Sequence, residues 1–227
     1  MLKIVSRIDL YSNTTGMDSP ELCLDKEHYS NYKKKVEYQY NSRGFRDHEW
    51  PEDLSDVIWC VGDSFTEGLG QPFGETWPCL LQEKTGRRCI NIGENGASND
   101  TIRMRVQNIS ESCNPKDIVI MWSYLHRRNS HTGDVHHDPN SFGNEEDIAN
   151  FSNNFQAVNQ LPTNVIHTII PNSIYGDERL PYFLQKLGSK VTDKLKIVEQ
   201  IDWARDHHHF DIQTSEKIVD WILGEIK

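Results

Sequence analysis

The feature that most constrains the fold is an alternation of short apolar runs with helix-like stretches, beginning at residue 56. Five runs have the length and composition of buried strands: 56–62 (DVIWCVG), 89–93 (CINIG), 117–122 (DIVIMW), 164–170 (NVIHTII) and 194–201 (KLKIVEQI). Strands that alternate with helices are joined by right-handed crossovers. The pattern therefore predicts an α/β fold with a mostly parallel five-stranded sheet covered by helices on both faces.

The segments between the runs carry helix signals. Residues 75–86 read as a short helix that stops at Gly86, and residues 98–113 as a helix capped by Ser98 or Asn99. From about Thr214 an apolar stripe at helical spacing predicts a C-terminal helix.

The rest of the chain is more polar. A length of 227 residues suits one domain, so we expect residues 1–55 to be a lead-in that packs on a domain formed by 56–227. Within the lead-in, residues 34–47 (KKVEYQYNSRGFRD) alternate like an edge strand that enters a turn at Gly44. The polar stretch from 127 to about 160 is interpreted as an insertion at the top of the sheet, where open α/β sheets bind ligands.

Charge and cysteine content indicate the setting. A formal net charge of −10 argues against a nucleic-acid partner, and the basic run 33–35, beside Arg43 and Arg46, is interpreted as a solvated face. No stretch approaches the length of a membrane span. The five cysteines form no C-x-x-C pair and leave one over if paired, which favours a reducing compartment. We expect a cytoplasmic protein, or a virion component made in a cytosol.

The first candidate for chemistry is Ser64, in GDSFTEG at 62–68. Because this motif follows the first apolar run, it puts a serine on the turn from a parallel strand into a helix. There its hydroxyl lies at the carboxyl edge of the sheet, and its N–H can stabilise an oxyanion. The alternative is an ordinary strand-end turn in which the serine only caps a helix.

The second candidate is the run 206–211 (DHHHFD), just before the C-terminal helix. A serine nucleophile needs a base, and an imidazole base needs a carboxylate that fixes its tautomer; Asp206 and His209 could supply both. The alternatives are a solvent-exposed histidine-rich turn and a metal hydrolase. No matching Cys/His set recurs at ligand spacing, so we expect neither a metal nor another cofactor.

Together, three motifs resemble blocks of the SGNH/GDSL hydrolase family: GDSFTEG, NIGENGAS at 91–98, and the D-x-x-H of 206–209. The resemblance covers about residues 56–227, and the lead-in segment 38–47 is also similar to the one that precedes the GDS strand in such proteins. It implies a three-layer α/β/α flavodoxin-like fold. It further implies that Ser64 is the nucleophile and first oxyanion donor, Gly96 the second donor, His209 the general base, and Asp206 the residue that orients it.

The third family block departs from its pattern. The family has G-x-N-D after the third strand, with the asparagine side chain as a third oxyanion donor, whereas Leu125 stands in that place here. The W-S-x-x-x-R sequence at 122–127 resembles a branch of the family found in phage and environmental proteins. Asn99, Arg127 and Asn129 are the candidate substitute donors.

The resemblance implies hydrolysis of an ester through an acyl-enzyme, with a short acyl group such as acetyl on a carbohydrate or another small polar molecule. The alternative is a binding or structural protein that keeps the fold with weak or no turnover, for example a carbohydrate-binding component of a phage particle. The intact Ser64, Asp206 and His209 favour the enzyme, and the leucine at 125 favours the alternative.

Overall fold

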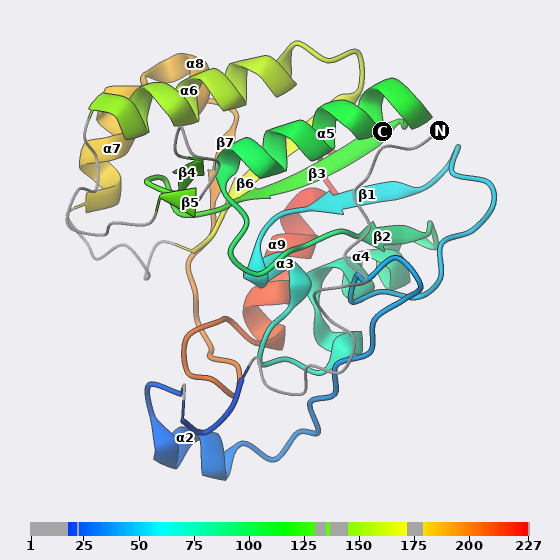
Figure 1. Ribbon diagram of the computed structural model, residues 1–227, viewed down its shortest axis with the longest axis vertical. Helices are drawn as coiled ribbons and strands as arrows, with labels where there is room; N and C mark the ends of the chain where they lie inside the picture. Colours follow the sequence, from blue (N-terminus) through cyan, green and yellow to red (C-terminus); the bar gives the residue numbers. More distant parts are fainter. Residues whose placement is uncertain (1–17, 22, 130–134, 137–144, 172–178, 227) are drawn as a thin grey trace.

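The computed structural model describes residues 18–21, 23–129, 135–136, 145–171 and 179–226 (Figure 1). Its centre is a five-stranded parallel sheet in the order β2-β1-β3-β6-β7. The strands are β1 (Ile58–Val61), β2 (Cys89–Asn91), β3 (Asp117–Trp122), β6 (Asn164–Ile169) and β7 (Leu195–Ile197). Counted along the chain, this is the order 2-1-3-4-5 of flavodoxin-like sheets. The predicted fold class is therefore confirmed.

Helices cover both faces of the sheet. α5 (Asn99–Cys113) and α6 (Glu145–Asn159) pack together on one face, and α4 (Trp77–Thr85) and α9 (Ile212–Ile222) pack together on the other (Figure 1). The shorter elements are α2 (Lys26–Asn31), α3 (Ser64–Glu67), the 3₁₀ turn η1 (Phe73–Glu75), α7 (Arg179–Leu187), α8 (Ser189–Thr192) and the two-residue strands β4 (Arg128–Asn129) and β5 (Val135–His136).

The local stop and start signals act as predicted. Gly86 ends α4 in the left-handed conformation, with φ of 68°. Ser98 is the N-cap of α5, since its Oγ accepts a hydrogen bond from the N–H of Thr101 at 3.1 Å. The C-terminal helix begins at Ile212, two residues earlier than predicted. β7 is shorter than its predicted run, because the chain leaves the sheet after Ile197.

One prediction for the polar stretch 127–160 is wrong. Its second half is the 15-residue helix α6, an ordinary part of the layer that covers the sheet. Phe151, Phe155 and Val158 are fully buried against the sheet, whereas the charged residues that make the stretch look polar gather in the first turn of the helix. Residues 130–134 and 137–144 of the predicted insertion lie outside the described residues.

The lead-in segment also differs from its prediction. Residues 34–40 form no strand, and they run beside the domain as extended chain that ends in a turn, with Gly44 at φ of 79°. Arg46 is not on a solvated face, because its side chain is only 1% exposed. Its guanidinium instead donates to the backbone oxygens of Glu37 at 2.8 Å and Gln71 at 2.7 Å. A buried arginine satisfied by loop carbonyls looks, in the sequence, like any other basic residue.

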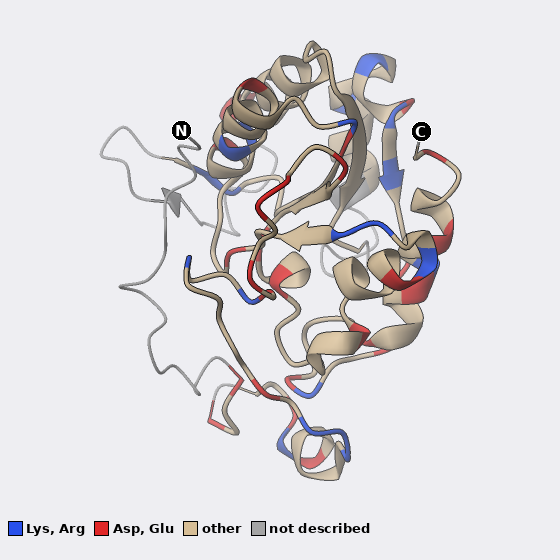
Figure 2. Cartoon of the chain, turned by 90° about the vertical axis from the view of Figure 1, so that its right-hand side faces the viewer, with Lys and Arg blue, Asp and Glu red and all other residues tan. Residues whose placement is uncertain are grey.

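The remaining basic residues follow the prediction more closely. Lys33, Lys35 and Arg43 are exposed, whereas Lys34 is half-buried and pairs with Glu75 at 2.6 Å and Asp211 at 2.9 Å. In the view of Figure 2, Lys and Arg positions are interspersed with Asp and Glu positions rather than gathered into one basic area. None of the helices in the described ranges combines the length and the apolar character needed to cross a bilayer.

Candidate active site

Ser64 is the first residue of α3, directly after the end of β1. Asp63 caps the helix, since its carboxylate accepts a hydrogen bond from the N–H of Phe65 at 3.1 Å. A Cβ at Gly62 would lie 2.1 Å from Oγ1 of Thr66, so the turn has no room for a larger residue. The serine hydroxyl is thereby held at the carboxyl end of a central strand, next to the point where the strand order reverses.

The structure brings the three predicted catalytic residues into one hydrogen-bonded chain. Nε2 of His209 lies 2.8 Å from Oγ of Ser64, and Nδ1 of His209 lies 2.5 Å from Oδ2 of Asp206. Oδ1 of Asp206 accepts the backbone N–H groups of His208 and His209, each at 3.0 Å. All three residues are buried, with Ser64 only 5% exposed. This is the geometry that a serine, its base and the orienting carboxylate require.

Electrostatics favours an ionised Asp206. Burial alone would raise its pKa, but the neighbouring His209 ring and the hydrogen bonds to the carboxylate outweigh burial and lower the pKa to about 2. The carboxylate is thus charged at neutral pH. A charged, fixed acceptor at Nδ1 holds the imidazole with Nε2 facing the serine and stabilises the imidazolium that forms when the serine loses its proton.

The other two histidines of the run point elsewhere. His207 has a left-handed backbone with φ of 55°, its ring stacks on His28 at 4.5 Å between centroids, and its Nδ1 lies 3.5 Å from the carboxylate of Asp25. Nε2 of His208 lies 2.9 Å from the hydroxyl of Tyr124. Burial lowers the pKa of His208 to about 4, so its ring is neutral at pH 7. Only the third histidine reaches the serine.

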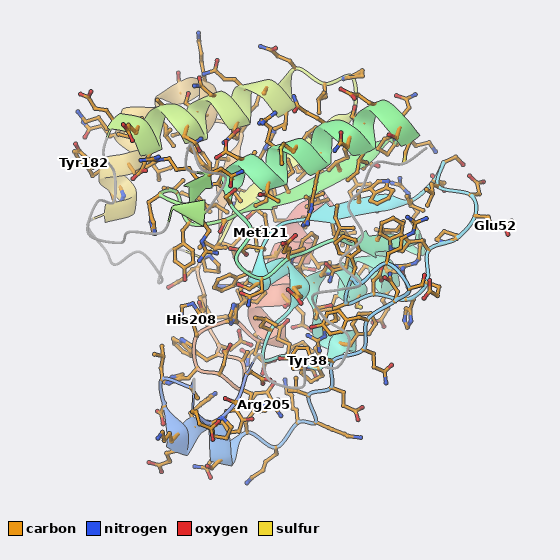
Figure 3. All side chains as sticks on the ribbon, viewed as in Figure 1. Tyr38, Glu52, Met121, Tyr182, Arg205 and His208 are labelled. Atoms are coloured by element: carbon orange, nitrogen blue, oxygen red, sulfur yellow. The ribbon has the colours of Figure 1, made fainter. Side chains whose placement is uncertain are left out.

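The described N-terminal residues brace the loop that carries Asp206 and His209. Nε2 of His28 lies 2.8 Å from the carbonyl oxygen of Ala204, and Sγ of Cys23 lies 3.2 Å from the carbonyl oxygen of Asp206. Asp18 forms an ion pair with Arg205 at 2.6 Å. In Figure 3, Arg205 lies between α2 and the rest of the molecule. The loop that carries Asp206 and His209 is therefore enclosed from the N-terminal side by contacts that span more than 170 positions of the sequence.

The loop after β2 packs tightly on α3. Asn91 ties the two together, since its Nδ2 donates to the carbonyl oxygen of Thr66 at 2.9 Å and its Oδ1 accepts the N–H of Gly93 at 2.9 Å. A Cβ at Gly93 would lie only 2.2 Å from the backbone nitrogen of Glu67. This close approach positions the loop relative to the helix that starts at Ser64.

Gly96, the expected second oxyanion donor, lies at the tip of this loop with φ of 81°, a left-handed conformation that favours glycine. The residue before it is held by Glu67, whose Oε2 accepts the N–H of Asn95 at 2.6 Å. Oε1 of Glu67 accepts the hydroxyl of Tyr40 at 3.1 Å. Glu67 is fully buried, so the last acidic residue of the GDSFTEG motif fixes the loop that carries Gly96.

The end of β3 differs from the family pattern in the way the sequence indicates. The Leu125 side chain is fully buried in the core and has no hydrogen-bond donor. Next to it, Oγ of Ser123 donates to Oδ2 of Asp63 at 2.5 Å, and Nη1 of Arg127 lies 3.7 Å from the same oxygen. Burial raises the pKa of Asp63, and the Arg127 charge opposes that rise.

The two candidate asparagines make side-chain hydrogen bonds to neighbouring segments. The side chain of Asn99 accepts the N–H of Ser123 at 3.0 Å and donates to the carbonyl oxygen of Tyr124 at 2.9 Å. Oδ1 of Asn129 accepts the hydroxyl of Ser98, the N-cap of α5, at 2.6 Å. Both asparagines thus hold the loop that follows β3 in place, and Arg127 remains as the third candidate.

Sequence reasoning missed three contributors to this site: Glu67, Tyr124 and Asp63. Both Glu67 and Asp63 lie inside GDSFTEG, but their partners lie 28 and 60 positions away, so only the folded chain shows what they bind. Tyr124 has no sequence signal that links it to His208. Among the described residues, no group of three or more His, Cys, Asp or Glu side chains is arranged to hold a metal ion.

Comparison with known proteins supports the fold. No protein-family model matches the sequence, and a comparison with curated proteins finds no match. Solved structures do match. TesA is similar with a TM-score of 0.52 and 16% identity, over 75% of this chain and 98% of that chain. A putative lipolytic protein of the G-D-S-L family from Desulfitobacterium hafniense has a TM-score of 0.54 and 12% identity, over 76% of this chain and 100% of that chain.

A third similar structure is a family two carbohydrate esterase from Clostridium thermocellum, in complex with cellohexaose. Its TM-score is 0.53 and its identity 14%, over 77% of this chain and 64% of that chain. At these identities the likeness establishes the fold.

Proposed function

We propose that this chain, which has the fold of the G-D-S-L and SGNH hydrolases, is a serine esterase that removes short acyl groups, such as acetyl, from carbohydrates or other small polar molecules. The observation that carries the proposal is the chain of hydrogen bonds from Ser64 through His209 to Asp206, at 2.8 and 2.5 Å. Such an arrangement activates a hydroxyl that is otherwise a poor nucleophile.

In the first half of the reaction, Oγ of Ser64 attacks the acyl carbon while its proton passes to Nε2 of His209. The carbonyl oxygen becomes an oxyanion and accepts hydrogen bonds from the N–H groups of Ser64 and Gly96. When the tetrahedral intermediate collapses, the imidazolium gives its proton to the leaving alcohol, and the acyl group stays on the serine. Asp206 stabilises the imidazolium throughout.

In the second half, water replaces the alcohol. His209 takes a proton from the water, whose oxygen attacks the acyl carbon, and the same two N–H groups hold the second oxyanion. Collapse returns the proton to Oγ of Ser64 and releases the carboxylic acid. The free enzyme is restored without a cofactor.

The carbohydrate part of the proposal is supported by the similarity to a carbohydrate esterase and by the polar groups beside the serine. Tyr124 and His208 join at the end of β3 and can offer hydrogen bonds to a hydroxylated alcohol. We further propose a reducing location, the cytoplasm or a virion assembled there, because the five cysteines are all free. The expected partner is the small ester itself, and the net charge of −10 disfavours nucleic acid.

Hydrolysis of p-nitrophenyl acetate and of acetylated sugars tests the proposal, with Ser64→Ala as the decisive variant. Activity should disappear in Ser64→Ala and persist in Ser55→Ala, a matched change at an exposed serine. Stability should change by no more than about 1 kcal/mol, because only one hydroxyl is removed. Equal hydrolysis by Ser64→Ala and the wild type would rule out a serine esterase.

A second candidate function is a binding or structural protein of the same fold with weak or no turnover, for example in a phage particle. The buried Leu125 in the place of the family asparagine favours it. A fluorophosphonate probe distinguishes the two, because it labels an activated serine. Labelling of Ser64 supports the esterase, and an unlabelled protein that still binds acetylated or free oligosaccharides supports the binding function.

A further inference from the structure

The starting point is a missing donor. With Leu125 buried in the core, the proposed oxyanion hole has two backbone donors, Ser64 N–H and Gly96 N–H. Loss of one donor from such a hole typically lowers kcat by about 10²–10³. Another donor at the end of β3 would restore this factor.

Arg127 lies near the end of β3, beside Asp63 and Ser123. Its Nη1 is 3.3 Å from Oγ of Ser123 and 3.7 Å from Oδ2 of Asp63, the residue that directly precedes Ser64 and caps its helix. The guanidinium therefore lies close to the side chain of the residue that precedes the nucleophile. Its side chain is 12% exposed, so it is largely shielded from solvent but not completely buried.

The guanidinium has donors to spare. Only Nη1 faces Asp63 and Ser123, and Nε and Nη2 of Arg127 make no hydrogen bond or ion pair with any residue in the described part of the chain. Asn99, by contrast, is fully buried and donates its amide to the carbonyl oxygen of Tyr124, and Asn129 accepts the hydroxyl of Ser98 through Oδ1 and carries no positive charge. A structural role as the counter-charge of Asp63 explains the position of Nη1. It does not explain Nε and Nη2, which stay available to donate hydrogen bonds.

The guanidinium lies over the ring of Tyr124. Cζ of Arg127 lies 4.7 Å from the centroid of the tyrosine ring, and the tyrosine hydroxyl lies 2.9 Å from Nε2 of His208, the neighbour of His209. Stacking on an aromatic face fixes the plane of a guanidinium and directs its N–H groups along that plane. The arginine thus lies between the carboxylate of Asp63 and the ring of Tyr124, whose hydroxyl contacts the loop that carries His209.

We propose that Arg127 is a catalytic residue that replaces the family asparagine as the third oxyanion donor, with Tyr124 as its positioning residue. This rests on the proposed esterase function. As the bond from Ser64 Oγ to the acyl carbon forms, the serine proton moves to His209, and the oxyanion accepts an N–H of Arg127 besides the two backbone groups. Arginine stays protonated throughout, so it gives a hydrogen bond and a positive charge but no proton.

The test compares Arg127→Ala with Arg43→Ala, a matched change at an exposed arginine that also stacks on an aromatic ring, Trp50, at 4.6 Å. On p-nitrophenyl acetate, Arg127→Ala should lose about 10²–10³ in kcat with little change in KM, because the lost interaction forms in the transition state. Arg43→Ala should keep full activity. Added guanidinium ion at millimolar concentration should restore part of the lost rate to Arg127→Ala only.

Removing the arginine leaves Asp63 without its counter-charge, so Arg127→Lys and the double variant Arg127→Ala/Leu125→Asn accompany the test. Lysine keeps the charge but not the planar fork, so its kcat should stay at least 10-fold low, whereas the double variant should regain activity through the restored asparagine. Full activity in Arg127→Lys, or kcat within threefold of wild type in Arg127→Ala, overturns the inference.

The two failures are distinguishable. If the wild type hydrolyses esters in a Ser64-dependent way and Arg127→Ala matches it, the inference fails and the esterase stands. If the folded wild type neither hydrolyses an ester nor reacts with a fluorophosphonate, the esterase fails and the inference falls with it. Loss of activity in Arg127→Ala with recovery by guanidinium supports both.

Discussion

Replacing Gly93 with alanine tests how closely the loop after β2 packs against the helix that begins at Ser64. A Cβ at position 93 would lie 2.2 Å from the backbone nitrogen of Glu67 and 2.7 Å from the carbonyl carbon of Thr66. Both are backbone atoms, so no change of rotamer relieves the clash, and either the loop or α3 has to move. Overpacking of a buried site costs about 1–3 kcal/mol. With backbone on both sides, we expect about 3 kcal/mol.

The measurement is thermal unfolding. For a chain of 150–250 residues, 1 kcal/mol lowers Tm by roughly 2–4 °C, so Gly93→Ala should lower it by about 6–12 °C. Ester hydrolysis should fall more than about 10-fold even well below Tm, because the displacement separates the N–H groups of Ser64 and Gly96, which a preorganised oxyanion hole holds at fixed distances.

Two other glycines serve as controls. Gly74→Ala should change stability by less than about 0.5 kcal/mol, because a Cβ there meets nothing within 4 Å and the backbone is not left-handed. A Cβ at Gly96 also has no atom within 4 Å, but alanine at a φ of 81° should lower the free energy of unfolding by about 1–2 kcal/mol. If Tm of Gly93→Ala is within 2 °C of wild type, the two segments are not packed as described, and the argument for a rigid oxyanion hole is wrong.

Three further predictions concern the catalytic loop and the sheet. His209→Ala should abolish acylation of Ser64 in a burst assay with p-nitrophenyl acetate, and His208→Ala should be much milder; the reverse ranking would identify a different base. Amide exchange should be slowest in β1, β3 and β6, the three strands with a neighbour on each side, and rapid exchange throughout β1 would contradict the sheet. Asp206 has its pKa lowered from 3.8 to about 2, so its ionised form stabilises the fold above about pH 4, and that contribution is lost as the pH falls towards 2. Urea unfolding should therefore show a loss of about 2 kcal/mol in Asp206→Asn at pH 6 that vanishes near pH 2, and an equal loss at both values would contradict the assignment.

Most of the fold could be predicted from short-range patterns in the sequence. The five apolar runs, the glycine that ends α4 and the serine that caps α5 act on residues within a few positions of themselves, so their effect can be predicted without knowing the rest of the molecule. The same holds for Ser64, whose strand-end turn is local. The pairing of Asp206 with His209, three residues apart, is local as well.

Two of the predictions that failed depended on how polar a stretch looks. Arg46 and helix α6 both carry charges in sequence and both lie against the core, because a few distant carbonyls satisfy the arginine and one apolar face buries the helix. The average polarity of a segment does not show whether one face of a helix is apolar, or whether one charged side chain has a buried partner, and these decide burial.

Which residues complete the site was decided by tertiary structure alone. Ser64 and His209 are 145 positions apart, Glu67 reaches the loop of Gly96 across 28, and Arg127 faces the carboxylate below the nucleophile across 64. The sequence by itself determined a serine at the end of a strand, a base and carboxylate on one loop, and a leucine in place of the family donor. Only the folded chain could show that Arg127 lies next to Asp63 and which groups Asn99 and Asn129 bind, because the free donors of a side chain depend on every partner that long-range packing brings to it.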